Sequence, residues 1–140
     1  ICKIIMKAAI INKTGGPEVI ELKEIILEKP GENEVTIEQK AIGLNYIDTY
    51  HRSGLYPLKL PIGLGLEGAG IITEVGSNVK NFKAGEKVAY AAIPLGSYST
   101  HRNFPTNKLV KIPNEVDLEV AATLMTKRFN YLLSFTSNLQ

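Results

Sequence analysis

The chain has 140 residues, of which 44% are apolar and 21% charged, a balance typical of a globular domain and not of a disordered chain. Sixteen basic and fourteen acidic side chains leave a net charge of +2 without a basic stripe, which argues against a nucleic-acid partner. The one cysteine, Cys2, excludes an internal disulfide and a zinc knuckle, and no apolar run is long enough for a membrane helix, so we expect a cytoplasmic protein.

Most of the chain has the pattern of short β-strands separated by turns. Val19–Leu27 alternates apolar and charged side chains, as a half-buried strand does, and the next turn follows at Pro30–Asn33. The predicted strands are Met6–Asn12, Val19–Leu27, Glu34–Leu44, Ala69–Val75, Lys87–Ala92, Ser97–Asn103 and Leu109–Ile112. Glycine and proline recur between them at short spacing. This pattern predicts a mainly β fold, with the sheet curled into a barrel or sandwich.

Two short helices are predicted. Asn45–Arg52 has a capping residue at its start and ends before Ser53-Gly54. Asp117–Met125 has an acidic first residue followed by good helix formers, and Asn114 or Asp117 would cap it. Residues 128–140 carry one apolar patch and then polar residues, and we interpret them as an aberrant or truncated tail.

The segment Gly63–Gly68 matches the dinucleotide pattern G-x-G-x-x-G, but its surroundings do not. That motif follows a strand and opens a helix, whose N–H groups hold the pyrophosphate. Here Pro61 precedes the glycines and the β-branched run Ala69–Val75 follows them. We therefore predict that these glycines allow tight backbone packing in a loop. Glu67, a lone carboxylate in this apolar stretch, is interpreted as a hydrogen-bonded structural group.

A dense polar and aromatic cluster, residues 45–52, follows the long strand. Loops at strand ends carry function more often than strand bodies, and its tyrosines could flank a flat ligand, although a capped, solvated helical turn explains the same residues equally well. The two histidines, His51 and His101, have no metal-ligand spacing, and we expect both at the surface.

Several motifs in order resemble the medium-chain dehydrogenase/reductase superfamily, and most closely its zeta-crystallin-like quinone oxidoreductase branch. They are Gly15–Val19, Ala41–Tyr50, Arg52–Tyr56, Gly63–Gly70, Val75–Val79, Lys83–Val88 and Gly96–Ser99. The resemblance implies that residues 1–127 form a GroES-like, partly open β-barrel with a few short helices. In such enzymes the active site lies between this domain and a Rossmann domain. We expect the Rossmann domain to be absent from this sequence, whose last residues are the tail at 128–140.

The resemblance also implies a zinc-independent enzyme. Zinc-dependent relatives have a cysteine where this chain has Asn45 and a histidine where it has Leu66, and neither replacement is a good zinc ligand. A zinc alcohol dehydrogenase is therefore disfavoured. A quinone accepts hydride without a metal, since hydrogen bonds can polarise its carbonyls.

By the same resemblance, the cofactor-binding residues are Tyr46, Ile47, Asp48, Thr49 and Tyr50. Asn45 and Tyr56 would lie near the quinone in positioning and polarising roles, and no residue is assigned to acid–base catalysis. The implied cofactor is NADP(H), although the choice between NADPH and NADH and the identity of the quinone stay open. Full-length relatives commonly form homodimers.

Two hypotheses follow. In the first, the chain is the N-terminal domain of an NADPH:quinone oxidoreductase, inactive alone unless a Rossmann-domain partner acts in trans. In the second, it is a non-enzymatic β-barrel module for binding or assembly, or a split-gene remnant, that kept the barrel and lost the chemistry.

Overall fold

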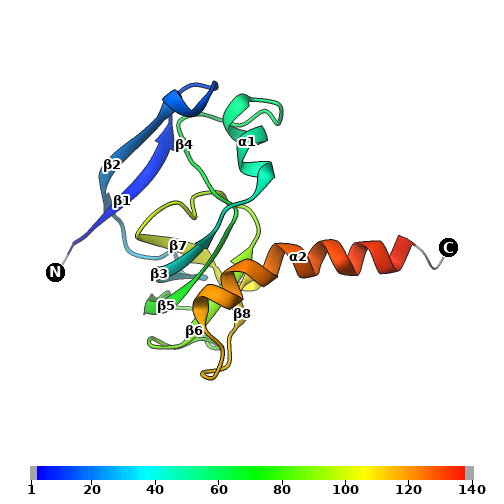
Figure 1. Cartoon of the computed structure of the whole chain (residues 1–140). Helices are drawn as coiled ribbons and strands as arrows, with labels where there is room; N and C mark the ends of the chain where they lie inside the picture. Colours follow the sequence, from blue (N-terminus) through cyan, green and yellow to red (C-terminus); the bar gives the residue numbers. More distant parts are fainter. Residues whose placement is uncertain (1–2, 138–140) are drawn as a thin grey trace.

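The computed structural model describes residues 3–137, with side chains up to Lys127, and has ten regular strands and helices besides two short 3-10 turns (Figure 1). The strands are β1 (Ile4–Ile11), β2 (Ile20–Leu27), β3 (Glu34–Gly43), β4 (Ile62–Gly63), β5 (Glu67–Val75), β6 (Lys87–Ala91), β7 (His101–Pro105) and β8 (Val110–Lys111). The helices are α1 (Tyr46–Ser53) and α2 (Leu118–Ser137). The predicted mainly β fold with a few helices is confirmed.

The strands form two open sheets. One has the order β2-β1-β4 and the other β7-β3-β5-β6-β8, with every neighbouring pair antiparallel. The segment before β7 joins them, because it bridges Ala8 of β1 through Ser99 and then pairs with β3. The predicted strand over Ser97–Asn103 therefore begins and ends before the observed strand β7, which is His101–Pro105. Its first residues cross between the two sheets.

The main core lies on one face of the larger sheet. Val35 and Ile37 of β3, Ile72 of β5 and Val88 of β6 are fully buried, around a stacked pair of rings, Tyr90 and Phe104. A single alternating face of β-branched side chains packs in this way.

A second core cluster fixes helix α2. Ala121 and Ala122 pack against Ala69 of β5 and Ala89 of β6, and small side chains on both surfaces let helix and sheet approach closely. The helix continues to Ser137, well beyond the predicted end at Met125, because no glycine or proline interrupts it. Figure 1 shows its C-terminal turns extending away from the two sheets.

Candidate functional site

Helix α1 sits at the junction of the two sheets, directly after the longest strand. β3 ends at Gly43, and Asn45 has the extended backbone of an N-cap residue, as predicted. The helix ends at Ser53 and is capped by Gly54, whose φ of 86° suits glycine. The sequence 45–54 thus fixes both ends of the element that carries most of the predicted site.

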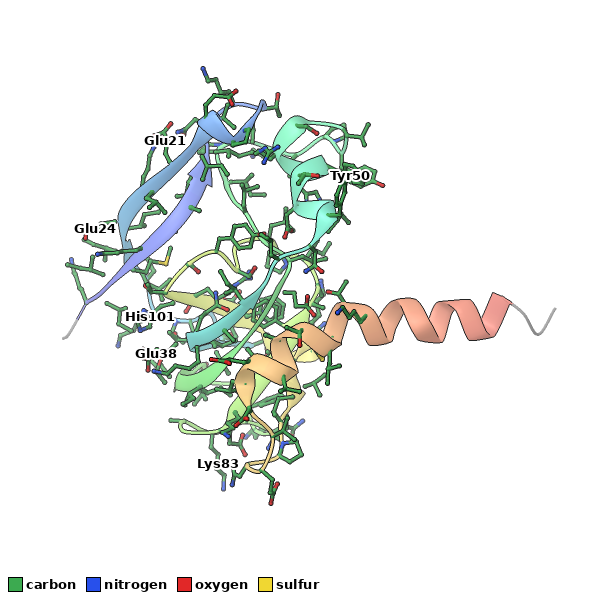
Figure 2. All side chains as sticks on the ribbon, viewed as in Figure 1. Glu21, Glu24, Glu38, Tyr50, Lys83 and His101 are labelled. Atoms are coloured by element: carbon green, nitrogen blue, oxygen red, sulfur yellow. The ribbon has the colours of Figure 1, made fainter. Side chains whose placement is uncertain are left out.

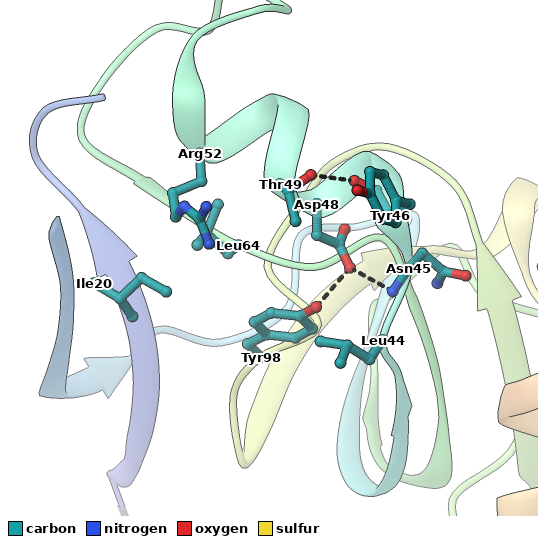
Figure 3. A pocket seen from close by; sticks show the side chains of 9 residues that line it. All are labelled: Ile20, Leu44, Asn45, Tyr46, Asp48, Thr49, Arg52, Leu64 and Tyr98. Carbon is teal, nitrogen blue, oxygen red and sulfur yellow. Dashed lines mark hydrogen bonds between the residues drawn. The ribbon is translucent and has the colours of Figure 1, made fainter. Parts of the chain in front are cut away.

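One side of α1 borders a cavity of about 350 Å³ that lies between this helix and the β1–β2 hairpin (Figure 3). The residues that line it are Ile20, Leu44, Asn45, Tyr46, Asp48, Thr49, Arg52, Leu64 and Tyr98. Most of its lining is hydrocarbon, with the Asp48 carboxylate among the few polar groups. The cavity is therefore the largely apolar pocket with few polar groups that small molecules favour.

Asp48 is buried and anchors the start of α1. Its Oδ2 accepts hydrogen bonds from the Asn45 backbone N–H at 3.1 Å and from the Tyr98 hydroxyl at 2.5 Å (Figure 3). Its Oδ1 is buried and has no hydrogen-bond partner among the described residues. Burial raises the pKa of Tyr98, and the hydrogen bond to Asp48 and the Asp48 charge raise it further, so the phenol stays a donor.

Helix α1 and the segment that follows it carry an aromatic cluster of Tyr46, Tyr50 and Tyr56. The Tyr50 ring meets Tyr46 edge-on at 5.7 Å and Tyr56 at 5.8 Å between centroids. Tyr46 and Tyr56 are 77% and 48% exposed, so flat faces are open to solvent. In Figure 2, Tyr50 lies on the side of the molecule toward which α2 extends. This aromatic cluster could hold a planar ring.

Four of the seven predicted site residues, Asn45, Tyr46, Asp48 and Thr49, line the cavity. Tyr46 also belongs to the aromatic cluster, together with Tyr50 and Tyr56, and Ile47 is partly buried. Sequence analysis missed the role of Tyr98. Its motif Gly96–Ser99 was recognised, but nothing in the sequence indicates which residue its hydroxyl meets.

The expectation that both histidines lie at the surface was wrong for His51, which is only 7% exposed. It lies on the inner part of α1, with its ring 6.0 Å from that of Tyr56. Each residue turns a helix by about 100°, so a shift of one or two positions decides which side chain is buried. The sequence pattern of so short a helix does not reveal this rotation. His101 is partly exposed on β7.

The glycine-rich segment leads into strand β5, as predicted, and not into a helix. Gly65 has a φ of 97°, and a β-carbon there would overlap the side chains of Ser97 and Tyr98. The glycines therefore serve close packing. Glu67, which follows them, is 2% exposed and hydrogen-bonded, as expected: Asn45 Nδ2 donates to its Oε2 at 2.7 Å.

Two features of the described residues bear on other functions. In that part of the chain, no group of three or more His, Cys, Asp or Glu side chains is arranged to hold a metal ion. Nor does any helix there have the length and apolar character needed to cross a membrane.

Comparison with known proteins gives the family. The profile of the alcohol dehydrogenase GroES-like domain matches residues 31–114. The chain belongs to this family. The GroES-like fold inferred from the sequence motifs is thereby confirmed, and the partly open arrangement of its two sheets agrees with it.

Relatives of this GroES-like domain include quinone oxidoreductases, as the motifs indicated. The chain is 50% identical to a quinone oxidoreductase of Pseudomonas aeruginosa, over 90% of this chain and 40% of that protein. A crystal structure of Escherichia coli quinone oxidoreductase complexed with NADPH superposes with a TM-score of 0.81 at 49% identity, covering 83% of this chain and 36% of that one. A 2-haloacrylate reductase of a Burkholderia species is 40% identical, over 95% of this chain and 42% of that protein. The chain spans about 40% of the length of these relatives.

Proposed function

We propose that this chain is the cleft-bearing N-terminal domain of a zinc-independent NADPH:quinone oxidoreductase. The observation that carries the proposal is the aromatic cluster of Tyr46, Tyr50 and Tyr56, in which Tyr50 lies on the side toward which α2 extends (Figure 2). The similarity to quinone oxidoreductases at up to 50% identity supports the same assignment. In the cytoplasm, the domain would supply one wall of a crevice whose other wall belongs to a Rossmann domain.

The described residues fit one end of the cofactor. The open faces of Tyr46 and Tyr56 suit a planar nicotinamide or quinone ring. By contrast, the glycines at 63–68 enter a strand, so they lack the helix N-terminus that binds a pyrophosphate. We therefore infer that this chain contacts the nicotinamide end through Tyr46–Tyr50 and that the phosphates are held elsewhere.

The chemistry assigned to this chain is binding and polarisation. When bound, NADPH supplies the hydride. The Asn45 carboxamide and the Tyr56 hydroxyl are the hydrogen-bond donors suited to a quinone carbonyl oxygen, where negative charge develops as the ring is reduced. The tyrosine rings hold the flat substrate in place and exclude water from one side.

Zinc-independence follows from the residues at two positions. Asn45 engages Glu67 through its amide nitrogen, and Leu66 offers no ligand atom, so the described residues supply neither of the two ligands that zinc-dependent relatives have there. Metal analysis of the purified chain is expected to find no stoichiometric zinc. One zinc per chain would contradict this part of the proposal.

The one-wall proposal is tested by titrating the purified chain with NADPH while following nicotinamide fluorescence. We expect no binding in the micromolar range and no quinone-dependent NADPH oxidation by the chain alone. Tight binding would contradict the proposal, because it would require a complete nucleotide site within these residues. A stable partner without a nucleotide-binding domain, recovered by pull-down, would favour the alternative of a non-enzymatic binding module.

A further inference from the structure

Two donors from distant parts of the chain converge on the buried carboxylate of Glu67. Asn45 Nδ2, at the start of α1, donates to Oε2 at 2.7 Å, and the backbone N–H of Thr126, in α2, donates to Oε1 at 2.7 Å. Both carboxylate oxygens are thus engaged, each by a group from a different helix. Two short bonds, one to each oxygen, hold the carboxylate in a single place.

The backbone around Glu67 is shaped to admit its carboxylate. Gly43 pairs with Glu67 in the β3–β5 ladder, and a β-carbon at this glycine would overlap the Glu67 carboxylate. Any larger residue at position 43 would displace the carboxylate from both donors. The close approach therefore depends on glycine at this one position.

The main chain of Asn45 takes part in a second set of hydrogen bonds. Its backbone N–H donates to Asp48, which also accepts from Tyr98. Asn45 is consequently held by its main chain to one buried carboxylate and by its side chain to the other. The line of bonds runs from Tyr98, before β7, through the first turn of α1 and Glu67 to helix α2.

We propose that Glu67 is a positioning residue of the cleft, which fixes the orientation of the Asn45 carboxamide and ties it to helix α2. This inference rests on the proposed function for its significance, since that function puts Asn45 beside the quinone. The bond to Glu67 directs Nδ2 to the carboxylate in every molecule, so the amide meets a substrate in one orientation. Displacement of α2 would release that orientation.

The isosteric variant Glu67→Gln separates this role from simple space filling. Glutamine has the same shape but offers one acceptor oxygen and one NH₂ group. The Thr126 N–H and the Asn45 NH₂ both donate to Glu67, and glutamine cannot accept both in the same way. One of the two donations is therefore lost, or the Asn45 amide rotates so that its oxygen accepts from the glutamine NH₂. The substitution keeps the side-chain volume but must change the hydrogen-bond pattern.

The test is NMR spectroscopy of the ¹⁵N,¹³C-labelled chain. The wild type is expected to show scalar couplings across both hydrogen bonds, from Asn45 Nδ2 and from Thr126 N to the Glu67 carboxyl carbon. In Glu67→Gln, at least one coupling is lost and the Asn45 side-chain amide signals shift. The control Glu74→Gln makes the same change at an exposed position of β5 and should leave both couplings intact.

Absence of the Asn45 coupling in the wild type, or unchanged Asn45 signals in a folded Glu67→Gln chain, would overturn the proposal. If Glu67→Gln does not fold, Asn45→Ala removes the Asn45 donor while leaving Glu67 and Thr126 in place, and the Thr126 amide signal should then shift. A Thr126 signal that stays in place would show that the two helices are not linked through Glu67. Because none of these signals depends on turnover, failure here is distinguishable from failure of the proposed quinone reduction.

Discussion

At the scale of single residues, the start of α1 depends on Asp48. This buried carboxylate receives one donor from the Asn45 main chain and one from Tyr98, more than forty positions away in sequence. A buried acceptor that loses its donor retains the full cost of desolvation. Tyr98 is therefore part of the support of the site, although it lies outside the helix that carries the site.

Tyr98→Phe is expected to lower the free energy of unfolding by about 1–3 kcal/mol, because it leaves a buried carboxylate oxygen with one donor fewer. Urea unfolding measures the change. Tyr46→Phe is the matched control: this side chain is 77% exposed, and the same substitution should change stability by less than about 0.5 kcal/mol. Equal stabilities of the two variants would contradict the role assigned to Tyr98.

The same pair predicts a pH dependence. Burial first, and Asp48 second, raise the pKa of Tyr98 above the ordinary tyrosine value of about 10. Above that pH the tyrosine ionises in the unfolded chain but not in the folded one, so its contribution to stability is lost as pH rises. The stability difference between wild type and Tyr98→Phe should therefore shrink from about pH 9 to about pH 11. A difference that grows over this range would contradict the pKa direction.

Local sequence predicted the cap at Asn45 and the tyrosines of α1, because each depends on neighbours within a few positions. The apolar, glycine-rich surroundings of Glu67 predicted that its carboxylate is structural, but not which groups bond it. It did not give the partner of Tyr98 or the burial of His51. Those depend on how α1 rotates against a segment distant in sequence. The link from Glu67 to Thr126 was equally invisible, since it needs the docked position of α2.

At the scale of elements, the loop between β4 and β5 packs closely against residues that are distant in sequence, and its conformation depends on that packing. Gly65 and Gly85 both have positive φ, at 97° and 89°. A β-carbon at Gly65 would overlap Ser97 and Tyr98, whereas one at Gly85 would meet nothing within 4 Å. Substitution of Gly85 therefore measures the cost of backbone strain alone, whereas substitution of Gly65 measures backbone strain together with steric overlap.

Gly85→Ala is expected to cost about 1 kcal/mol from the positive φ alone, and Gly65→Ala clearly more, because overlap adds to the same strain. Thermal or urea unfolding of both variants gives the comparison. If Gly65→Ala cost no more than Gly85→Ala, the close packing inferred for this glycine-rich segment would be wrong.

The periodicity of the sequence predicted the strands and helices, and the observed elements differ from the predicted ones mainly at their ends. The alternation in β2 and the apolar runs of β3, β5 and β6 mark half-buried or buried strands, and the structure has them. The crossing segment 97–100 has the composition of a strand but pairs with β1 through a single bridge, because it passes between two sheets. Such a crossing is a property of topology that no local pattern contains.

At the scale of the whole molecule, α2 joins the site to the rest of the protein. It packs against β5 and β6 through Ala121 and Ala122 and contacts Glu67 through Thr126. It then extends past the sheets on the side where Tyr50 lies (Figure 2). We expect the second wall of the crevice to lie on that side. The central claim is thus that this domain carries a working quinone cleft once a nucleotide-binding domain faces it.

The most direct test is a graft in which this chain replaces the matching N-terminal part of the Pseudomonas aeruginosa quinone oxidoreductase, to which it is 50% identical. NADPH oxidation is measured with 1,4-benzoquinone and, for comparison, with a 2-haloacrylate, in the presence of a chelator. We predict quinone-dependent turnover within about tenfold of the parent, equivalent to a barrier change of about 1.4 kcal/mol. A folded graft that binds NADPH but does not reduce the quinone, or does so only with added zinc, would contradict the claim.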